Sequence, residues 1–311
     1  MYRIGVDLGG TNIAAGLVDD DGKIKASKSI KFVTRNNHED LAADIAGLCK
    51  DLMQIGGVGS AQIHSVGLGS PGTIDPPNGT IIKAHNLNIV NMPASHLIGR
   101  VLNLPVYVEN DANCAALGEA AFGAARGAKN SITITLGTGI GCGIIIDSKI
   151  YSGTFFGAGE AHFVIRADGK MCTCGLRGCW EEYGSARGLV SEATQRQYRL
   201  DESQILKLVG DIKNITPKII FEAADLGDNL AIFAIENYID NLCLGLGALI
   251  NILQPEIIVI GGGLSGRGQT LVNHINCRLP DVVYARDVRT KIVLAALGND
   301  AGIIGAAMLD K

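Results

Sequence analysis

The sequence predicts an α/β protein made of two related lobes. The first observation is a strand, a glycine turn and a second strand that occur together twice, over residues 3–18 and 131–146. The second is the alternation of strand-like and helical segments between residues 39 and 122, which favours helices packed against a sheet. The third is the length of 311 residues, which suits one large domain or two medium lobes with buried cores.

The two glycine turns hold matching places in the repeated unit. Glycine lets a main chain turn tightly and approach an anion, so that backbone N–H groups can bind phosphate. A pair of ordinary hairpins is the alternative for either turn alone. The pairing, with Asp7 at the end of the first strand, favours a nucleotide site. The expected phosphate-binding residues are Gly9, Gly10 and Thr11 in the first turn, and Gly137, Thr138 and Gly139 in the second.

Further segments carry the pattern of a helix or a strand. They are a helix at 39–55, strands at 63–69 and 105–109, an Ala-rich helix at 112–122, a mainly helical region from 185 to 253 with an apolar helix at 241–253, a strand at 256–260 and a helix at about 301–309. We expect one lobe at 1–118, with a helix at about 298–311 returning to it, and a larger lobe at 119–297. No low-complexity linker separates them, which predicts a hinge near 115–128.

Composition excludes several classes of protein. The net charge of -4 and the absence of a basic run argue against nucleic acid as the main partner. No apolar run reaches the roughly 18 residues that a membrane helix needs. The sequence starts directly in a strand, which is unlike a signal peptide. We therefore expect a cytoplasmic enzyme with small-molecule substrates, no nucleic acid and no membrane.

The eight cysteines fall into two groups. Three of them, Cys172, Cys174 and Cys179, lie within eight residues, and His162 lies ten residues upstream. Three thiolates and an imidazole make a four-coordinate structural zinc site that is closed to water. Gly175 and Gly178 would let the loop fold around a metal, and three reduced surface thiols without metal are the alternative. The others are expected to be buried free thiols: Cys49, Cys114, Cys142, Cys243 and Cys277.

Asp111 is the candidate for acid–base chemistry. It follows the strand at 105–109 and precedes a helix, where side chains commonly project into a cleft. A carboxylate there can accept a proton from an attacking hydroxyl, or it can cap the helix; position alone leaves both possible. No Gly-x-x-x-x-Gly-Lys-Ser/Thr stretch and no protein-kinase signature is present, which disfavours those two phosphate-transfer architectures.

The motifs, taken in order, resemble the ROK family of sugar kinases and sugar-responsive repressors, within the actin/hexokinase-like ATPase superfamily. The resemblance covers essentially the whole chain. It implies a two-lobed actin/hexokinase-like (ribonuclease H-like) fold with a duplicated core and a zinc-binding loop. The matching segments are 7–11, 69–72, 109–113, 136–141, 172–175, 178–181, 261–263 and 300–302.

The resemblance also implies an activity and its residues. It implies ATP-dependent phosphorylation of a hexose at the 6-hydroxyl, glucose first, with Mg²⁺ and a structural Zn²⁺ held by His162 and the three cysteines. Asp111 would be the base and Asp7 would act on magnesium through water. Gly262 and Gly263 would face the adenosine, unless they only form a strand-to-helix turn. The implied sugar-binding residues are Gly69, Asn110, Asp111, Glu160, His162 and Glu181; Glu182 is expected to be a solvated charge.

One segment departs from the family pattern. Family members usually show Glu-x-x-His, whereas this chain has Gly159-Glu160-Ala161-His162, one residue shorter. Either Glu160 reaches the sugar through a tightened loop, or that contact is altered. The sugar therefore stays open among glucose, mannose, N-acetylglucosamine, N-acetylmannosamine and fructose.

Other readings belong to different classes. Repressors of the family carry an N-terminal DNA-binding arm, and only six residues precede Asp7 here, so we expect a kinase rather than a regulator. A binding protein that has lost turnover is disfavoured because Asp111 and both glycine turns are present. Polyphosphate as the donor stays open. Family members are commonly homodimers, which we expect here too.

Overall fold

The computed structural model describes residues 1–35, 37–195 and 197–311. The chain packs into two compact units. The first comprises Met1–Thr133, Cys142–Gly159 and Ala295–Lys311, and the second comprises Ile134–Gly141 and Glu160–Leu294. These bounds are not those of the expected lobes, 1–118 with 298–311 and 119–297, which stay a prediction.

A five-stranded sheet forms the centre of the first unit, with the order β3-β2-β1-β4-β8. β1 pairs antiparallel with β2, and β1, β4 and β8 run parallel. The expected strands at 63–69 and 105–109 are confirmed as β4 and β8. The strands are β1 (Tyr2–Leu8), β2 (Asn12–Asp19), β3 (Ile24–Lys31), β4 (Ile63–Ser70) and β8 (Val106–Asn110).

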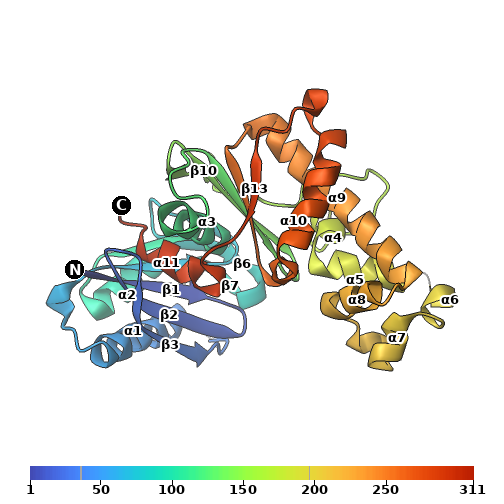
Figure 1. Cartoon of the computed structure of the whole chain (residues 1–311). Helices are drawn as coiled ribbons and strands as arrows, with labels where there is room; N and C mark the ends of the chain where they lie inside the picture. Colours follow the sequence, from blue (N-terminus) through green and yellow to red (C-terminus); the bar gives the residue numbers. More distant parts are fainter. Residues whose placement is uncertain (36, 196) are drawn as a thin grey trace. The chain divides into compact units, whose positions relative to one another are not determined.

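Helices cover both faces of this sheet (Figure 1). α1 (His38–Ile55) and α2 (Ala94–Leu102) lie on one face, and α3 (Asp111–Phe122) and α11 (Ala301–Ala307) lie on the other. The apolar face expected of α1 is confirmed because its periodic leucine and isoleucine residues are all buried: Leu41, Ile45, Leu48 and Leu52. A small antiparallel sheet of β5 (Thr73–Asp75), β6 (Thr80–Ala84) and β7 (Ile89–Met92) follows β4.

α11 lies in direct backbone contact with its neighbours. A Cβ atom on Gly5 or Gly67 would overlap the backbone carbonyl oxygen of Ile303 or Ala306 in α11. A Cβ atom on Gly305 of α11 would overlap the backbone carbonyl oxygen of Cys114 in α3. The absence of side chains at these glycines therefore fixes how closely the last helix approaches the strands and helix that carry Asp7 and Asp111.

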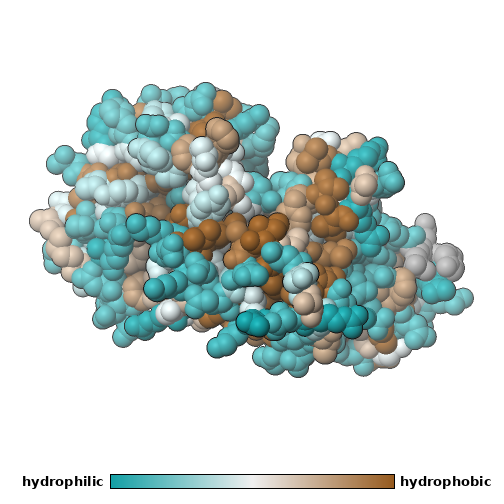
Figure 2. Space-filling model, turned by 90° about the horizontal axis from the view of Figure 1, so that it is seen from above, coloured by the Kyte–Doolittle hydropathy of each residue, from teal (hydrophilic) through white to brown (hydrophobic). Residues whose placement is uncertain are grey.

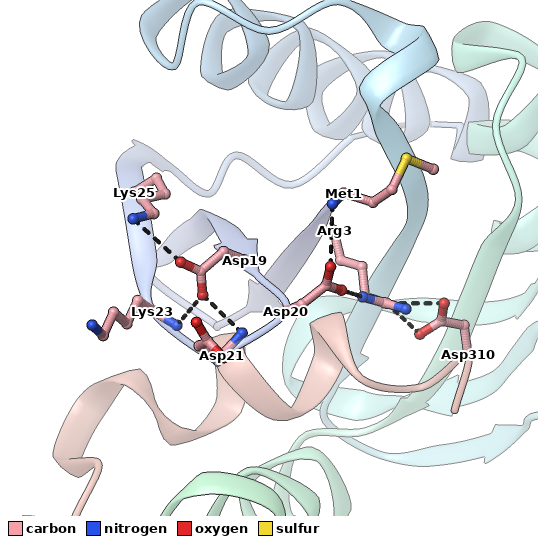
Figure 3. A network of polar contacts seen from close by, with 8 residues as sticks. All are labelled: Met1, Arg3, Asp19, Asp20, Asp21, Lys23, Lys25 and Asp310. Atoms are coloured by element: carbon pink, nitrogen blue, oxygen red, sulfur yellow. Dashed lines mark hydrogen bonds and ion pairs between the residues drawn. The ribbon is translucent and has the colours of Figure 1, made fainter.

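An ion-pair network holds the residues after α11 (Figure 3). The Arg3 guanidinium donates from Nε to both oxygens of Asp310, at 2.8 and 2.9 Å, and from Nη1 to Asp20 at 2.6 Å. His64 Nε2 lies 3.0 Å from the same Asp310 carboxylate, whose side chain is 2% exposed. β1 thereby binds the end of the chain.

A second five-stranded sheet has the order β11-β10-β9-β12-β13. Its β9 and β10, like β1 and β2, are strands joined by a glycine turn, so the predicted repeat is confirmed. The strands are β9 (Ser131–Leu136), β10 (Ile140–Ile146), β11 (Lys149–Ile150), β12 (Ile257–Gly261) and β13 (Lys291–Leu294).

The second unit is rich in helices, as expected from about residue 185 onward. The long α9 packs against α4, α5, α8 and α10. The helices are α4 (Glu181–Gly184), α5 (Ala186–Thr194), α6 (Gln197–Leu200), α7 (Gln204–Val209), α8 (Pro217–Asp225), α9 (Asn229–Leu253) and α10 (Gln269–Arg278).

Two sequence-based expectations are corrected here. The apolar helix expected at 241–253 is the second half of α9, which begins at Asn229 because the Asp228 side chain caps it by accepting from Ala231 N–H at 2.8 Å. Cys277, expected to be buried, is exposed because it lies off the buried stripe of α10; Cys49, Cys114, Cys142 and Cys243 are buried free thiols as predicted.

The face shown in Figure 2 is mainly hydrophilic, with apolar side chains gathered near its middle. Among the described residues, no helix has both the length and the apolar character required to span a membrane.

Candidate active site

Three parallel strands bring predicted site residues to one edge of the first unit's sheet. Asp7 of β1 is the register partner of Gly69 in β4, and Gly69 is the partner of Glu109 in β8. Ser70 pairs with Asn110 in the same way. Because the carboxyl ends of parallel strands meet at one edge, the residues that end β1, β4 and β8 are neighbours.

Asn110, rather than Asp111, is the N-cap of α3. Its side-chain oxygen accepts from Ala112 N–H at 2.9 Å and Asn113 N–H at 3.2 Å, and its amide nitrogen donates to the Gly72 carbonyl at 3.2 Å. Asp111 is the first helical residue and also accepts from Ala112 N–H, at 2.9 Å. The capping alternative for Asp111 is therefore not needed to explain the helix start.

Asp7 and Asp111 form an acidic pair whose charges influence each other. Burial is the main cause that raises the pKa of Asp111, against hydrogen bonds from Ala112, its own N–H and Asn110 that lower it. Burial, followed by the charge of Asp111, raises the pKa of Asp7 to about 6. In the described part of the chain neither carboxylate forms an ion pair with lysine or arginine. Two such groups can receive a proton or face a hard cation.

The first glycine turn joins β1 to β2 beside this pair. Gly10 and Thr11 are exposed, and Gly9 N–H donates to the Asn12 carbonyl at 3.0 Å. Neither Gly9 nor Gly10 has the left-handed φ that requires glycine. Space favours glycine at position 9, because a Cβ there would lie 3.0 Å from the Asn12 oxygen, whereas a Cβ on Gly10 would make only ordinary contact with Asn86 Nδ2 at 3.8 Å.

The second glycine turn lies in the second unit and is held at both ends. The Gly137 carbonyl accepts from Ala186 N–H at the start of α5, at 2.9 Å, and Ile140 N–H donates to Glu181 Oε2 at 3.1 Å. A Cβ atom on Gly139 would overlap that Glu181 oxygen. Thr138, at the tip, is exposed. Glu181, predicted to contact a sugar, therefore already binds the backbone of the predicted phosphate turn.

The glycines after β12 differ from each other. Gly262 has φ +81°, and a Cβ there would lie 2.6 Å from the backbone nitrogen of Leu136. Gly263 begins a short 3₁₀ helix and has open space beside its Cα. The turn itself therefore requires Gly262, which agrees with the strand-to-helix alternative. Both glycines are solvent-exposed.

The predicted metal ligands come together in the second unit. The ligand atoms of His162, Cys172, Cys174 and Cys179 all lie within 4.8 Å of one another. Cys172 Sγ is 3.4 Å from His162 Nδ1, and Cys174 Sγ is 3.5 Å from Cys179 Sγ. A tetrahedral zinc ion with Zn–S bonds of about 2.3 Å sets its sulfur ligands about 3.8 Å apart. The four residues therefore fit a structural zinc ion.

Backbone features shape this loop for its ligands. Gly175 and Gly178 both have left-handed φ, and a Cβ on Gly178 would overlap the carbonyl oxygen of Arg166. A hydrogen bond from Leu176 N–H lowers the pKa of Cys174, which favours the thiolate that binds metal. Cys172 and Cys179 are buried and only Cys174 is exposed, so the three thiols are not all on the surface, and the bound zinc ion stays a prediction.

The loop is attached to α9 through two side chains. Trp180 is fully buried, its Nε1 donates to the Asn241 carbonyl at 3.1 Å, and its ring stacks on Phe163 at 5.2 Å between centroids. Arg166 Nη2 donates to Asn241 Oδ1 at 2.8 Å. Residues on both sides of the cysteines thus anchor the loop to the helical core of the unit.

The two glutamates beside this loop differ in exposure. Glu160 Oε2 lies 3.9 Å from His162 Nε2, and its side chain is 54% exposed. His162 therefore presents Nδ1 to the cysteines and Nε2 toward Glu160. Glu182, expected to be a solvated charge, is only 13% exposed because Arg187 Nη2 donates to it at 2.7 Å.

The structure thus brings the predicted residues together in two sets, one in each unit. The first set is Asp7, Gly9, Gly10, Thr11, Gly69, Asn110 and Asp111; the second is Gly137, Thr138, Gly139, Glu160, His162, Cys172, Cys174, Cys179, Glu181, Gly262 and Gly263. Sequence reasoning gave no role to Glu109, Asn113 or Ser152. Glu109 and Asn113 had a signal because both lie in the matching segment 109–113, whereas Ser152 had none.

The chain is similar to known proteins over nearly its whole length. The model of the ROK family matches residues 3–311. Glucokinase of Thermotoga maritima is 35% identical over 314 residues, covering 100% of this chain and 98% of its own. The structure of a ROK family glucokinase from Streptomyces griseus, in complex with glucose and AMPPNP, is 36% identical with a TM-score of 0.83 and covers 99% of both chains. A xylose repressor of Caldicellulosiruptor bescii is 30% identical, over 97% of this chain and 76% of the repressor.

Proposed function

This chain belongs to the ROK family, and from that premise we propose that it transfers the γ-phosphoryl group of ATP to the 6-hydroxyl of a hexose, with glucose as the first substrate. Full-length similarity to glucokinases, one of them in complex with glucose and an ATP analogue, supports both substrates. The observation that carries the proposal is the half-buried Asp111 carboxylate, whose pKa is raised, at the strand edge beside Asp7.

Phosphoryl transfer depends on positioning and charge neutralisation more than on covalent chemistry. We propose that Asp111 accepts the proton of the attacking sugar hydroxyl. Asn110 uses its oxygen as the helix cap and donates from its amide nitrogen to Gly72, and it also hydrogen-bonds the Asp111 carboxylate. We propose that a sugar hydroxyl would replace Asp111 as the acceptor of this second hydrogen bond.

The glycine turns would bind the phosphates through backbone N–H groups. Asp7 would hold Mg²⁺ through water, and this ion would neutralise charge on the transferring phosphoryl group. Gly262 and Gly263 would lie along the adenosine. Their exposure in the structure supports contact with a ligand.

The zinc ligands would have a structural role. His162 would bind the metal through Nδ1, which leaves Nε2 to hydrogen-bond a sugar hydroxyl. Glu160 and Glu181 are the further residues proposed for the sugar. The 3.9 Å approach of Glu160 to His162 supports a shared contact despite the shortened spacing between them.

The first test compares the parent enzyme with Asp111→Ala and Asp111→Asn in a coupled ADP-release assay with Mg-ATP. We expect kcat to fall by about 10²–10⁴-fold in both, because each removes the proton acceptor. Exposed Asp21→Asn is the control and should keep full activity. Equal turnover in all four proteins would remove Asp111 from the mechanism, and no activity on any hexose would overturn the kinase proposal.

The second test is a panel of sugars. Glucose, mannose, fructose, N-acetylglucosamine and N-acetylmannosamine are compared by kcat/KM, because the short Glu160–His162 spacing leaves the acetamido sugars open. Polyphosphate replaces ATP in a parallel arm.

A DNA-retention assay tests the alternative that the protein is a transcriptional regulator, which the similarity to a xylose repressor supports. We also propose a homodimer in the cytoplasm, which light scattering and cell fractionation would check.

A further inference from the structure

A buried glutamate directly precedes the residues proposed for the sugar. Glu109, in β8, is 6% exposed. Its carboxylate accepts three hydrogen bonds: from Asn110 N–H at 2.7 Å, from Asn113 Nδ2 at 3.0 Å and from Ser152 Oγ at 3.2 Å. Each partner is neutral. A carboxylate buried among neutral donors is costly unless they are held in place, so this arrangement requires an explanation.

We infer that Glu109 is a positioning residue that sets the orientation of Asp111 in the proposed reaction. The inference rests on the proposed function. Two of its hydrogen bonds bracket Asp111 in the chain, since one fixes the amide of Asn110 and the other fixes the side chain of Asn113. Asp111 lies between these two fixed points, at the first position of α3.

The bond to Asn113 depends strongly on Glu109. Asn113 is 4% exposed, and in the described part of the structure its Oδ1 accepts no hydrogen bond. Among the described residues, the side-chain hydrogen bond that holds this amide is the one it donates to Glu109. Without Glu109, both polar groups of a buried amide in the first turn of α3 would be unpaired, and the turn would rearrange to satisfy them.

The third hydrogen bond extends this anchor to another segment of the first unit. Ser152 follows β11 and donates to the Glu109 oxygen that the other two donors do not use. Both carboxylate oxygens are thus engaged. One side chain therefore holds the strand end, the helix start and the segment after β11 at fixed positions.

Glu119, which lies in α3 like Asp111, provides a matched comparison for Glu109. It is fully buried and also accepts three hydrogen bonds, from the N–H groups of Ala124, Ala296 and Leu297 at 2.7, 3.1 and 2.9 Å. None of these donors adjoins Asp111. Glu119 therefore has the burial and bonding of Glu109 without its position at the helix start.

The experiment compares Glu109→Ala, Glu109→Gln, Asn113→Ala and Glu119→Gln with the parent, by steady-state kinetics on the best hexose and by thermal unfolding. For Glu109→Ala we expect kcat to fall by about 10–100-fold, with little change in the KM for the hexose or for ATP. The reason is that an Asp111 carboxylate displaced by a fraction of an ångström loses much of its catalytic effect. Asn113→Ala should lie between parent and Glu109→Ala. Glu119→Gln should lower Tm and keep kcat.

Rescue by the conservative variant separates positioning from general destabilisation. In Glu109→Gln the amide oxygen can accept from Asn110 and Asn113, and the amide nitrogen can donate to Ser152 once that hydroxyl reverses. We therefore expect kcat within about threefold of the parent. The lower limb of the kcat–pH profile should shift in Glu109→Ala, where the surroundings of Asp111 change, and stay in place in Glu119→Gln.

Several results would overturn the inference. A Glu109→Ala enzyme with kcat within twofold of the parent would do so, as would a loss of kcat in Glu119→Gln equal to that in Glu109→Ala. If Glu109→Ala does not fold, Asn113→Ala with unchanged kcat and pH profile would overturn it, and a lowered kcat at unchanged KM would support it. A parent inactive on every hexose overturns the proposed function as well, whereas an active parent identifies a failure of this inference alone.

Discussion

The acidic pair in the first unit and the cysteine loop in the second are held in place by different means. Asp7 and Asp111 sit on strand and helix ends, in a region where glycines allow backbones to touch and buried side chains bind the main chain. Residues 162–179 contain no helix or long strand, and their order comes from two left-handed glycines, an anchoring tryptophan and four metal-ligand atoms. The first region depends on packing, and we expect the second to depend on coordination of a metal ion.

This difference predicts which perturbation will disrupt the structure of each region. A region built by close packing tolerates chelators but responds to one added methyl group. A loop built around a metal tolerates small changes of side-chain volume but depends on its ligands being deprotonated and occupied. The following predictions separate these two dependences.

The largest effect is expected from removal of the metal. Dialysis against a strong chelator, or Cys172→Ser, should lower activity at sub-saturating sugar by about 10–100-fold, because His162 and Glu181 would lose their fixed positions. Metal content by emission spectroscopy and the KM for sugar are measured together. Cys277→Ser, an exposed cysteine outside the cluster, is the control. A fully active protein that contains no metal would contradict the coordination view of this loop.

The next effect is expected from one methyl group in the packed region. In Gly305→Ala the new Cβ would overlap the Cys114 carbonyl and lie 2.8 Å from the Gly118 nitrogen, so backbone atoms have to move. We expect a loss of about 3 kcal/mol or more, read as a fall in Tm of about 2–4 °C per kcal/mol. Bound metal should be unchanged.

Gly47→Ala is the matched control for this variant. Gly47 is in α1, and its Cβ would meet nothing within 4 Å. We expect no loss, or a gain of about 0.5–1 kcal/mol, because alanine is the better helix former. Equal changes in Tm for Gly305→Ala and Gly47→Ala would show that the contact of α11 with α3 is not tight.

The smallest effect concerns the charge of Asp7. Its pKa is raised from 3.8 to about 6 in the folded chain, so the native state binds a proton more tightly than the unfolded chain between these values. Its contribution to stability is therefore full at low pH and is lost as the pH rises through about 6. Asp7→Asn should stabilise the ligand-free protein by up to about 3 kcal/mol at pH 8, and by only about a third of that at pH 4.5.

Thermal unfolding at the two pH values, without nucleotide or Mg²⁺, measures this effect. The same variant should lose activity with Mg-ATP, which would make Asp7 a residue kept for chemistry at a cost in stability. Exposed Asp21→Asn should show no such pH-dependent gain. A Tm for Asp7→Asn that is unchanged at both pH values would mean that Asp7 is solvated rather than buried.

Much of the fold could be predicted because local pattern and burial agree. For the helix at 39–55, the strand at 63–69 and the helix at 112–122, the structure moves one boundary of each by a single position. β3 was not predicted because its residues alternate between intermediate and exposed, which leaves no continuous apolar signal. The small sheet of β5, β6 and β7 consists of strands too short to have a clear period.

Some residues of the candidate site could likewise be predicted from the sequence, and others could not. The cluster of His162 with three cysteines follows from residue types that have few other uses at such spacing, and the structure brings the four together. The roles of Glu109 and Asn113 could not be read from the sequence, because each depends on a hydrogen bond whose donor and acceptor come together only after β8 and α3 pack. The capping role of Asn110 was obscured by Asp111 beside it, which is equally suited to that position.

The place of α11 has a consequence for synthesis on the ribosome. β1 leaves the exit tunnel early, but the helix that fits against Gly5 and Gly67 is translated nearly 300 residues later. Until then the part of the sheet that α11 covers stays open, and Arg3 has no Asp310 to bind. A polypeptide that terminates before α11 would therefore have an incomplete core beneath Asp7 and Asp111. We expect cellular proteases to degrade such a chain, and we expect it to have no activity as a shorter enzyme.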